Sequence, residues 1–152
     1  MTLGIVLMLT TSCSESDFFN NYQSAHEGWE QEDLKVFNFD VVDTVNVYQS
    51  YINIRTNNSY AFSNLFLIVK MIPPQGNATI DTLQYQMAKP DGSMLGAGFT
   101  DVKEHKLVWR IPLKFDVLGT HTVEIEHAMR RANEVQGEAV LKGVTEIGLQ
   151  IQ

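Results

Sequence analysis

Two glutamates on one predicted strand come closest to the spacing that catalysis by paired carboxylates requires. Glu124 and Glu126 alternate with apolar residues, so both carboxylates lie on one face of the strand. Strand geometry separates them by about 7 Å, which falls within the range of paired glycosidase carboxylates. Any strand with period-two alternation produces this spacing, and nothing else in the sequence marks a sugar-cleaving site. We therefore interpret the pair as a solvated face and predict no catalytic residue.

The histidines and glycines do not indicate a metal ion or a phosphate ligand. His121 and His127 lie six residues apart on one strand face among apolar neighbours, too far apart to chelate an ion alone. Cysteine-rich zinc sites need several thiolates, and this chain has a single cysteine. Gly92, Gly96 and Gly98 precede a predicted strand instead of opening a helix, so we expect them at turns. The sequence predicts no metal and no cofactor.

Cys13 ends a short apolar stretch at the start of the chain. Residues 3–9 are apolar, which is far short of the roughly 20 residues that cross a bilayer but matches the core of a signal peptide. Residues 9–13, LTTSC, resemble a bacterial lipobox, whose cysteine carries diacylglycerol and becomes the mature N-terminus. Each buried acyl methylene contributes about 0.8 kcal/mol, so two or three chains hold a protein on a membrane. We predict a signal peptide over 1–12 and a lipid on Cys13; an ordinary signal peptide is the alternative.

The charge of the chain is acidic and unevenly distributed. The net charge is -7 and the pI is about 4.9, and no basic stripe is present that could bind a nucleic-acid backbone. Residues 14–33 hold six acids and neither lysine nor arginine. We therefore predict no nucleic-acid partner, and an acidic, lipidated tether over 13–33.

The rest of the chain consists of short runs with period-two alternation, separated by turn residues. The run at 65–72 is continuously apolar, which favours a central strand covered on both faces. Residues 130–140 have the only helical character. The predicted strands occupy 34–42, 48–56, 65–72, 78–87, 105–113, 120–129 and 145–151. Seven or eight strands at this spacing predict an all-β fold, an antiparallel β-sandwich of immunoglobulin-like or jelly-roll type over 34–152.

One connection between predicted strands has the composition of a binding loop. It joins the strands at 48–56 and 65–72 and combines aromatic side chains with amides, which could stack on a partner or a sugar. An asparagine-rich turn whose side chains cap their own backbone is the alternative. The candidate contact residues are Arg55, Asn57, Asn58, Tyr60 and Phe62.

Three stretches together are similar to the successive signature blocks of the gliding motility lipoprotein GldH family of Bacteroidota. They are INIRTNNSYAFSNLFLIV, DTLQYQMAKPDGSMLGAGFTDVKEHKL and GTHTVEIEHAMR, and the similarity extends from about Trp29 to the C-terminus. The resemblance implies an envelope lipoprotein that serves gliding and type IX secretion together with other envelope proteins. It implies no catalytic residue, and we expect a lipid-anchored location at the outer membrane. A surface module that binds carbohydrate or peptide through Tyr60 and Phe62 is the second hypothesis.

Overall fold

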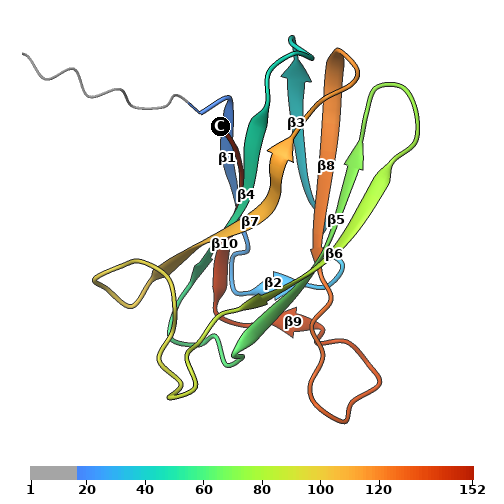
Figure 1. Cartoon of the computed structure of the whole chain (residues 1–152). Helices are drawn as coiled ribbons and strands as arrows, with labels where there is room; N and C mark the ends of the chain where they lie inside the picture. The colour runs from blue at the N-terminus through green and yellow to red at the C-terminus, as the bar shows by residue number, and fades with distance from the viewer. Residues whose placement is uncertain (1–16) are drawn as a thin grey trace, which may run out of the picture.

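The computed structural model describes residues 17–152, which form ten β-strands and no helix (Figure 1). Accordingly, no helix able to span a membrane occurs in this part of the chain. The predicted signal peptide and Cys13 lie outside the described residues. The strands are β1 (Phe19–Ser24), β2 (Trp29–Glu30), β3 (Lys35–Val41), β4 (Tyr48–Thr56), β5 (Asn64–Ile72), β6 (Thr79–Gln86), β7 (Lys103–Leu113), β8 (Gly119–His127), β9 (Val140–Leu141) and β10 (Val144–Ile151).

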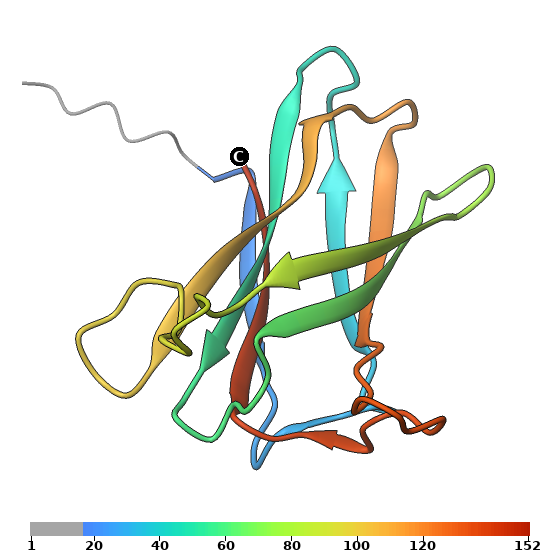
Figure 2. The ribbon, with the colours of Figure 1, turned by 60° about the horizontal axis from the view of Figure 1, so that its bottom comes forward.

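Two four-stranded antiparallel sheets form the two layers of a sandwich (Figures 1 and 2). The first sheet has the order β1-β10-β4-β7 and the second the order β3-β8-β5-β6. The short pair β2 and β9 lies across one end of the sandwich. The predicted all-β antiparallel sandwich is confirmed, with three more strands than the seven located in the sequence.

The core forms where the buried faces of the two sheets meet. In β3 every second residue is buried, and β8 repeats the pattern from His121 to His127. This is the consequence of period-two side-chain alternation when one face of a sheet is covered. The largest fully buried side chains are Trp29, Phe37, Phe115, Ile52, Ile54, Leu65, Leu67, Met87, Ile125, Met129, Leu141 and Ile147.

Two local predictions are wrong. β5 is an inner strand, but its residues alternate between buried and half-buried, so only one of its faces is fully covered. Its outward side chains are a mixture of apolar and polar residues, and Phe66 packs at the margin of the core. Residues 130–140 form a loop with turns instead of helical structure; Asn133 has φ of 68°, a left-handed conformation that interrupts a helix.

The segment expected as a tether over 13–33 contains two strands of the sandwich. β1 pairs with β10 along its whole length, from Phe19 opposite Ile151 to Ser24 opposite Glu146. Trp29 in β2 is fully buried, as expected for a residue that docks on the domain. The sandwich therefore begins at β1, and the acidic residues from Glu27 to Asp33 belong to the folded part of the chain.

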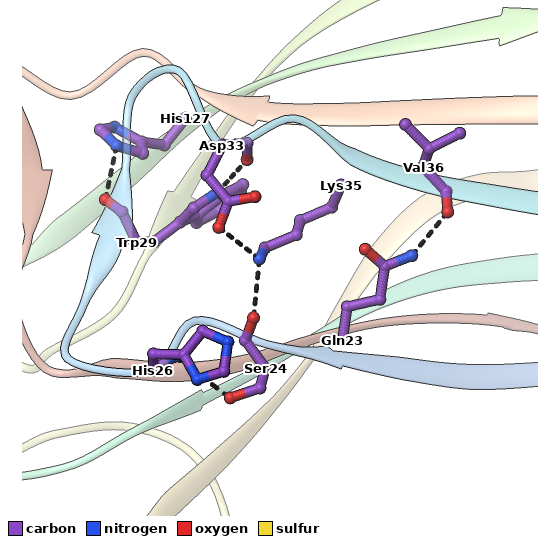
Figure 3. A network of polar contacts seen from close by, with 8 residues as sticks. All are labelled: Gln23, Ser24, His26, Trp29, Asp33, Lys35, Val36 and His127. Atoms are coloured by element: carbon purple, nitrogen blue, oxygen red, sulfur yellow. Dashed lines mark hydrogen bonds and ion pairs between the residues drawn. The ribbon is translucent and has the colours of Figure 1, made fainter.

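A polar network fastens this N-terminal segment to the sandwich (Figure 3). The buried Lys35 ammonium donates to the Ser24 carbonyl at 2.7 Å and forms an ion pair with Asp33 at 2.5 Å. The Trp29 indole donates to the Asp33 carbonyl at 2.9 Å. His127 Nε2 lies 3.0 Å from the Trp29 carbonyl, which links the segment to β8 in the second sheet.

The two ends of the sandwich carry different groups of loops. We call the first the N-proximal end: it consists of Asp17 and Phe18 with the loops at 42–47, 73–78 and 114–118. The Phe18 ring lies 5.0 Å from Tyr48 and 6.4 Å from Phe115, measured between centroids, which places the start of the described chain beside two of these loops. We call the opposite end the loop end: it consists of β2, β9 and the loops at 57–63, 87–102 and 128–139 (Figure 1).

Candidate functional site

The loop at 57–63 of the loop end carries four of the five contact residues predicted from the sequence, Asn57, Asn58, Tyr60 and Phe62, whereas Arg55 lies in β4. Backbone hydrogen bonds join the loops of this end: the Met87 amide donates to the Ser63 carbonyl at 2.7 Å, and the Ala128 amide donates to the Phe66 carbonyl at 2.9 Å. The Asn57 amide donates to the Gly143 carbonyl at 2.8 Å. Connections that are distant in sequence therefore form one surface.

Tyr60 supports this surface from beneath, contrary to its expected exposure. The ring is 6% exposed, and its hydroxyl donates to the Asn64 carbonyl at 2.7 Å. Burial raises the pKa of the Tyr60 phenol, so the hydroxyl stays protonated. Phe62 lies edge-on against Tyr60 with centroids 6.0 Å apart and is half-buried at the margin of the core. Phe62 is therefore partly accessible for stacking, whereas Tyr60 is not.

The two asparagines in this loop differ in role. The Asn57 side chain accepts a hydrogen bond from the Ser59 amide at 2.9 Å, and its carbonyl accepts from the Tyr60 amide at 3.1 Å. Asn57 thus caps its own turn, as the alternative interpretation of this loop predicts. Asn58 at the tip of the turn is exposed to solvent.

Arg55 belongs to a charged cluster on the outer face of the first sheet. Its guanidinium binds Glu104 at 3.0 Å and Glu146 at 2.5 Å and lies over the Tyr22 ring, 4.4 Å from its centroid. The Tyr22 hydroxyl donates to Glu104 at 2.7 Å. Strand pairing explains the cluster, because Arg55 in β4 lies opposite Glu104 in β7 on one side and Glu146 in β10 on the other.

The cluster shifts the pKa values of two of its members, so that the Tyr22 phenol stays neutral and the Glu104 carboxylate stays charged. Burial raises the pKa of Tyr22 to about 12, and its bond to Glu104 acts in the same direction. Burial alone would raise the pKa of Glu104, but the bonds from Tyr22 and Arg55 outweigh it and lower that pKa. The guanidinium is thus held by two carboxylates and supports the end of β4.

Two open grooves lie on either side of Ser63 and Asn64, which line both. One groove, of about 550 Å³, runs between the Phe62 loop and the loop that holds Arg130 and Arg131. The other, of about 720 Å³, runs along the end of β6 and the turn at 88–92. Both are shallow surface features. The first groove combines the half-buried Phe62 ring with Arg130, with Glu134 and with Arg131, which is paired with Glu138 at 2.9 Å, so it suits a polypeptide that carries aromatic and polar side chains.

The most exposed aromatic residue of the loop end was absent from the sequence-based candidates. Phe99 is fully exposed in the loop between β6 and β7. Gly96 and Gly98 shape this loop with φ of 98° and 151°, and a Cβ on Gly96 would lie 2.7 Å from the Glu104 carbonyl oxygen. The predicted turn role of these glycines is confirmed. An isolated phenylalanine within a glycine-rich turn is the signal that could have identified Phe99.

Most of the other residues considered for catalysis or metal binding are buried or paired with neighbouring side chains. His105, His121 and His127 are buried. His105 contacts the Thr56 hydroxyl at 3.1 Å, and burial lowers its pKa. Glu124 forms an ion pair with Lys70 at 3.2 Å. Within residues 17–152, no three histidine, cysteine, aspartate or glutamate side chains gather as a metal site would require.

Comparison with known proteins identifies relatives along almost the whole chain. The sequence pattern of the GldH lipoprotein family matches residues 17–151. The chain is 44% identical over 146 residues to a gliding motility lipoprotein GldH homolog from Christiangramia forsetii, covering 96% of this chain and 90% of the relative. It is 40% identical over 152 residues to the gliding motility lipoprotein GldH of Flavobacterium johnsoniae, covering 98% and 94%.

Among solved structures, the VP2 subviral particle of infectious bursal disease virus aligns with 99% of this chain and 37% of its own. The TM-score is 0.37 and the identity 13%. The sequence relatives, in contrast, are similar over nearly their full length. On the pattern match and these two relatives, the chain belongs to the GldH lipoprotein family.

Proposed function

We propose that this protein is a lipid-anchored component of the gliding motility and type IX secretion machinery, that it acts without catalysis, and that its loop end binds an envelope protein. The acyl chains are attached to Cys13, and the membrane is the outer membrane. The observation that carries the proposal is the composition of the loop end, where Asn58 and Phe99 are exposed and Phe62 is half-buried.

The anchor is supported by the sequence and by the family. Cys13 is the single cysteine of the chain and follows a lipobox-like stretch. The family that matches the chain is described as a lipoprotein, and the relative from Flavobacterium johnsoniae is called a gliding motility lipoprotein. A lipid anchor fits a domain whose described part starts at residue 17, four residues after Cys13.

Many of the polar groups of the domain are bonded to one another or to the backbone, which favours a binding role over an enzymatic one. The charged cluster uses Arg55, Glu104 and Glu146 to bind one another, and the buried histidines contact backbone or hydroxyl groups. A general acid or base must instead face a substrate in a cleft. The groove beside Phe62 is open and lined by arginines and amides, which fits recognition of a protein surface.

Complementation tests the proposal. The chain is expressed in Flavobacterium johnsoniae from which its own GldH relative has been deleted, and colony spreading and secretion by the type IX system are measured. We expect the unaltered chain to restore both. A Cys13→Ala variant is expected to restore neither, because the anchor is lost. The double variant Asn58→Ala with Phe62→Ala is expected to reach the membrane in normal amount and still fail to restore spreading.

The matched control is Val108→Ala, which truncates a half-exposed apolar residue on the outer face of the first sheet. This variant is expected to behave like the unaltered chain. If the loop-end double variant restores spreading and secretion as well as Val108→Ala does, the loop end is not the binding surface. If Cys13→Ala restores both, the lipid anchor is not needed for this function.

A further inference from the structure

The N-proximal end exposes apolar side chains in two neighbouring loops. Val42 is 79% exposed and Val45 is 85% exposed, and Val47 and Leu118 are exposed by more than half. Val42 and Leu118 adjoin a strand pair, since Val41 lies opposite Gly119 where β3 and β8 meet. Exposed apolar residues gathered in adjacent loops are typical of an interaction surface.

The β3–β4 loop has a fixed shape that presents these valines. The Asp43 carboxylate accepts hydrogen bonds from the Val45 amide at 2.7 Å and the Asn46 amide at 3.3 Å. This aspartate is the one charged residue of the loop at 42–47. Its carboxylate faces the backbone of its own turn, and the side chain of Val45 is left in solvent.

The described part of the chain begins at the N-proximal end, with Asp17 and Phe18. Cys13 is four residues from Asp17, and four residues of extended chain span at most about 14 Å. Phe18 packs beside Tyr48 and Phe115. Tyr48 directly follows Val47, and Phe115 belongs to the same loop as Leu118. An acyl group on Cys13 would therefore hold the N-proximal end close to the bilayer.

The charged residues of the N-proximal end are few. The loop at 73–78 is uncharged, and the loop at 114–118 carries one lysine and one aspartate. The carboxylates of Asp17 and Asp40 at the N-proximal end accept hydrogen bonds from neighbouring side chains. Glu27, Glu30 and Glu32 lie near β2 at the opposite end. With Asp43 and Asp116 added to Asp17 and Asp40, and with Lys114 the one base, the N-proximal end is itself acidic, so contact with a bilayer there would depend on the burial of apolar side chains and not on attraction to anionic headgroups.

From these observations we propose that Val42, Val45, Val47 and Leu118 form a second membrane contact, which inserts into the lipid headgroup region and fixes the orientation of the domain. The occupant of this surface is the bilayer that holds the Cys13 acyl chains. The inference rests on the proposed anchor, and it adds that the domain lies on the membrane by one defined end. Apolar side chains on such surfaces are buried about 5–10 Å into the boundary between headgroups and acyl chains.

Quenching by brominated lipids tests the contact. The full-length lipoprotein is reconstituted into vesicles of phosphatidylethanolamine and phosphatidylglycerol, with and without bromine on the acyl chains. A tryptophan is introduced by Val45→Trp at the N-proximal end or, as the matched control, by Val135→Trp, whose parent side chain is 96% exposed at the loop end. The native Trp29 and Trp109 are buried, so the unaltered protein supplies the background.

We expect the added tryptophan of Val45→Trp to lose several-fold more fluorescence to brominated lipid than that of Val135→Trp. Equal quenching at both positions, or none at Val45→Trp, overturns the membrane contact. Mass spectrometry of the same samples reports the state of Cys13. An unmodified thiol refutes the anchor and with it this inference, whereas an acylated protein without quenching refutes the contact and leaves the anchor standing.

Discussion

Replacing Gly143 with alanine would test how strongly the loop end depends on one close backbone contact. Gly143 lies between β9 and β10 with φ of 84°, and its carbonyl accepts the Asn57 amide at 2.8 Å. A Cβ at this position would lie 2.5 Å from the Tyr60 Cα and 2.6 Å from the Ser59 carbonyl carbon. Since both are backbone atoms, the loop at 57–63 would have to move.

Two costs add in the Gly143→Ala variant. A left-handed conformation costs a residue other than glycine about 1–2 kcal/mol. Forcing extra volume into a packed site costs about 1–3 kcal/mol. We therefore expect the free energy of unfolding to fall by about 2–5 kcal/mol. In a domain of this length each kcal/mol lowers the thermal midpoint by about 2–4 °C, which gives a decrease of about 4–20 °C.

Gly76→Ala is the matched control, because Gly76 has φ of 97° and no heavy atom lies within 4 Å of an added Cβ. It carries only the conformational cost, so its midpoint should fall by about 2–8 °C. Circular dichroism of both purified variants during heating measures the difference. Equal decreases in the two variants, or a larger decrease in Gly76→Ala, would refute the argument that the Tyr60 loop packs against Gly143.

Three further substitutions address the charged cluster, a buried histidine and the buried tyrosine. Glu104→Gln should lower the free energy of unfolding in urea by about 0.5–1 kcal/mol at neutral pH, because the cluster is partly exposed. Its contribution is complete above the ordinary glutamate pKa of about 4.3 and is lost as the pH falls through the lowered folded-state pKa. Burial lowers the pKa of His105, so folding favours its neutral form. Its contribution to the free energy of unfolding is complete above the ordinary histidine pKa of about 6.5 and declines as the pH falls toward the folded-state pKa. His105→Asn should flatten the decline in thermal midpoint over that window. Tyr60→Phe should cost about 1–2 kcal/mol in urea unfolding, because the Asn64 carbonyl loses its donor.

Each of these expectations has an outcome that contradicts it. A Glu104→Gln protein as stable as the parent at neutral pH would mean that the cluster contributes nothing. An unchanged pH profile in His105→Asn would assign the acid sensitivity to other groups. An unchanged unfolding curve for Tyr60→Phe would show that water replaces the lost donor.

Period-two alternation predicted strands such as β3 and β8 because each is fully buried on one face only. The run in β8 is an example: Val123 and Ile125 face the core while Glu124 faces outward, so the sequence pattern and the burial pattern coincide. The sequence did not predict β1, because β1 is a polar edge strand that is held in the sheet by its pairing with β10. β2 and β9 have two residues each, which is too few for a period to be recognised.

The candidate contact residues stay a prediction, and the structure gives several of them surroundings that the sequence did not indicate. The composition of the loop after β4 indicated an exposed aromatic surface, whereas Phe62 is half-buried. The burial of Tyr60 depends on Asn64 and on a close contact with Gly143, more than eighty positions away. The engagement of Arg55 depends on the register of three strands. Long-range pairing of this kind leaves no periodic trace in the sequence.

The inclusion of β1 in the sandwich changes what a lipid anchor can do. A tether as far as residue 33 would let the domain rotate freely above the bilayer, whereas a sandwich that begins with β1 at Phe19 leaves at most about 22 Å of extended chain between Cys13 and the first strand. With the N-proximal end on the membrane, the strands run away from it, and nine residues of β4 span about 30 Å. The proposed binding surface near Phe62 would then face a partner at that height above the bilayer. Lengthening the segment before Asp17 with glycine and serine should therefore weaken complementation even though the anchor and the loop end are both intact.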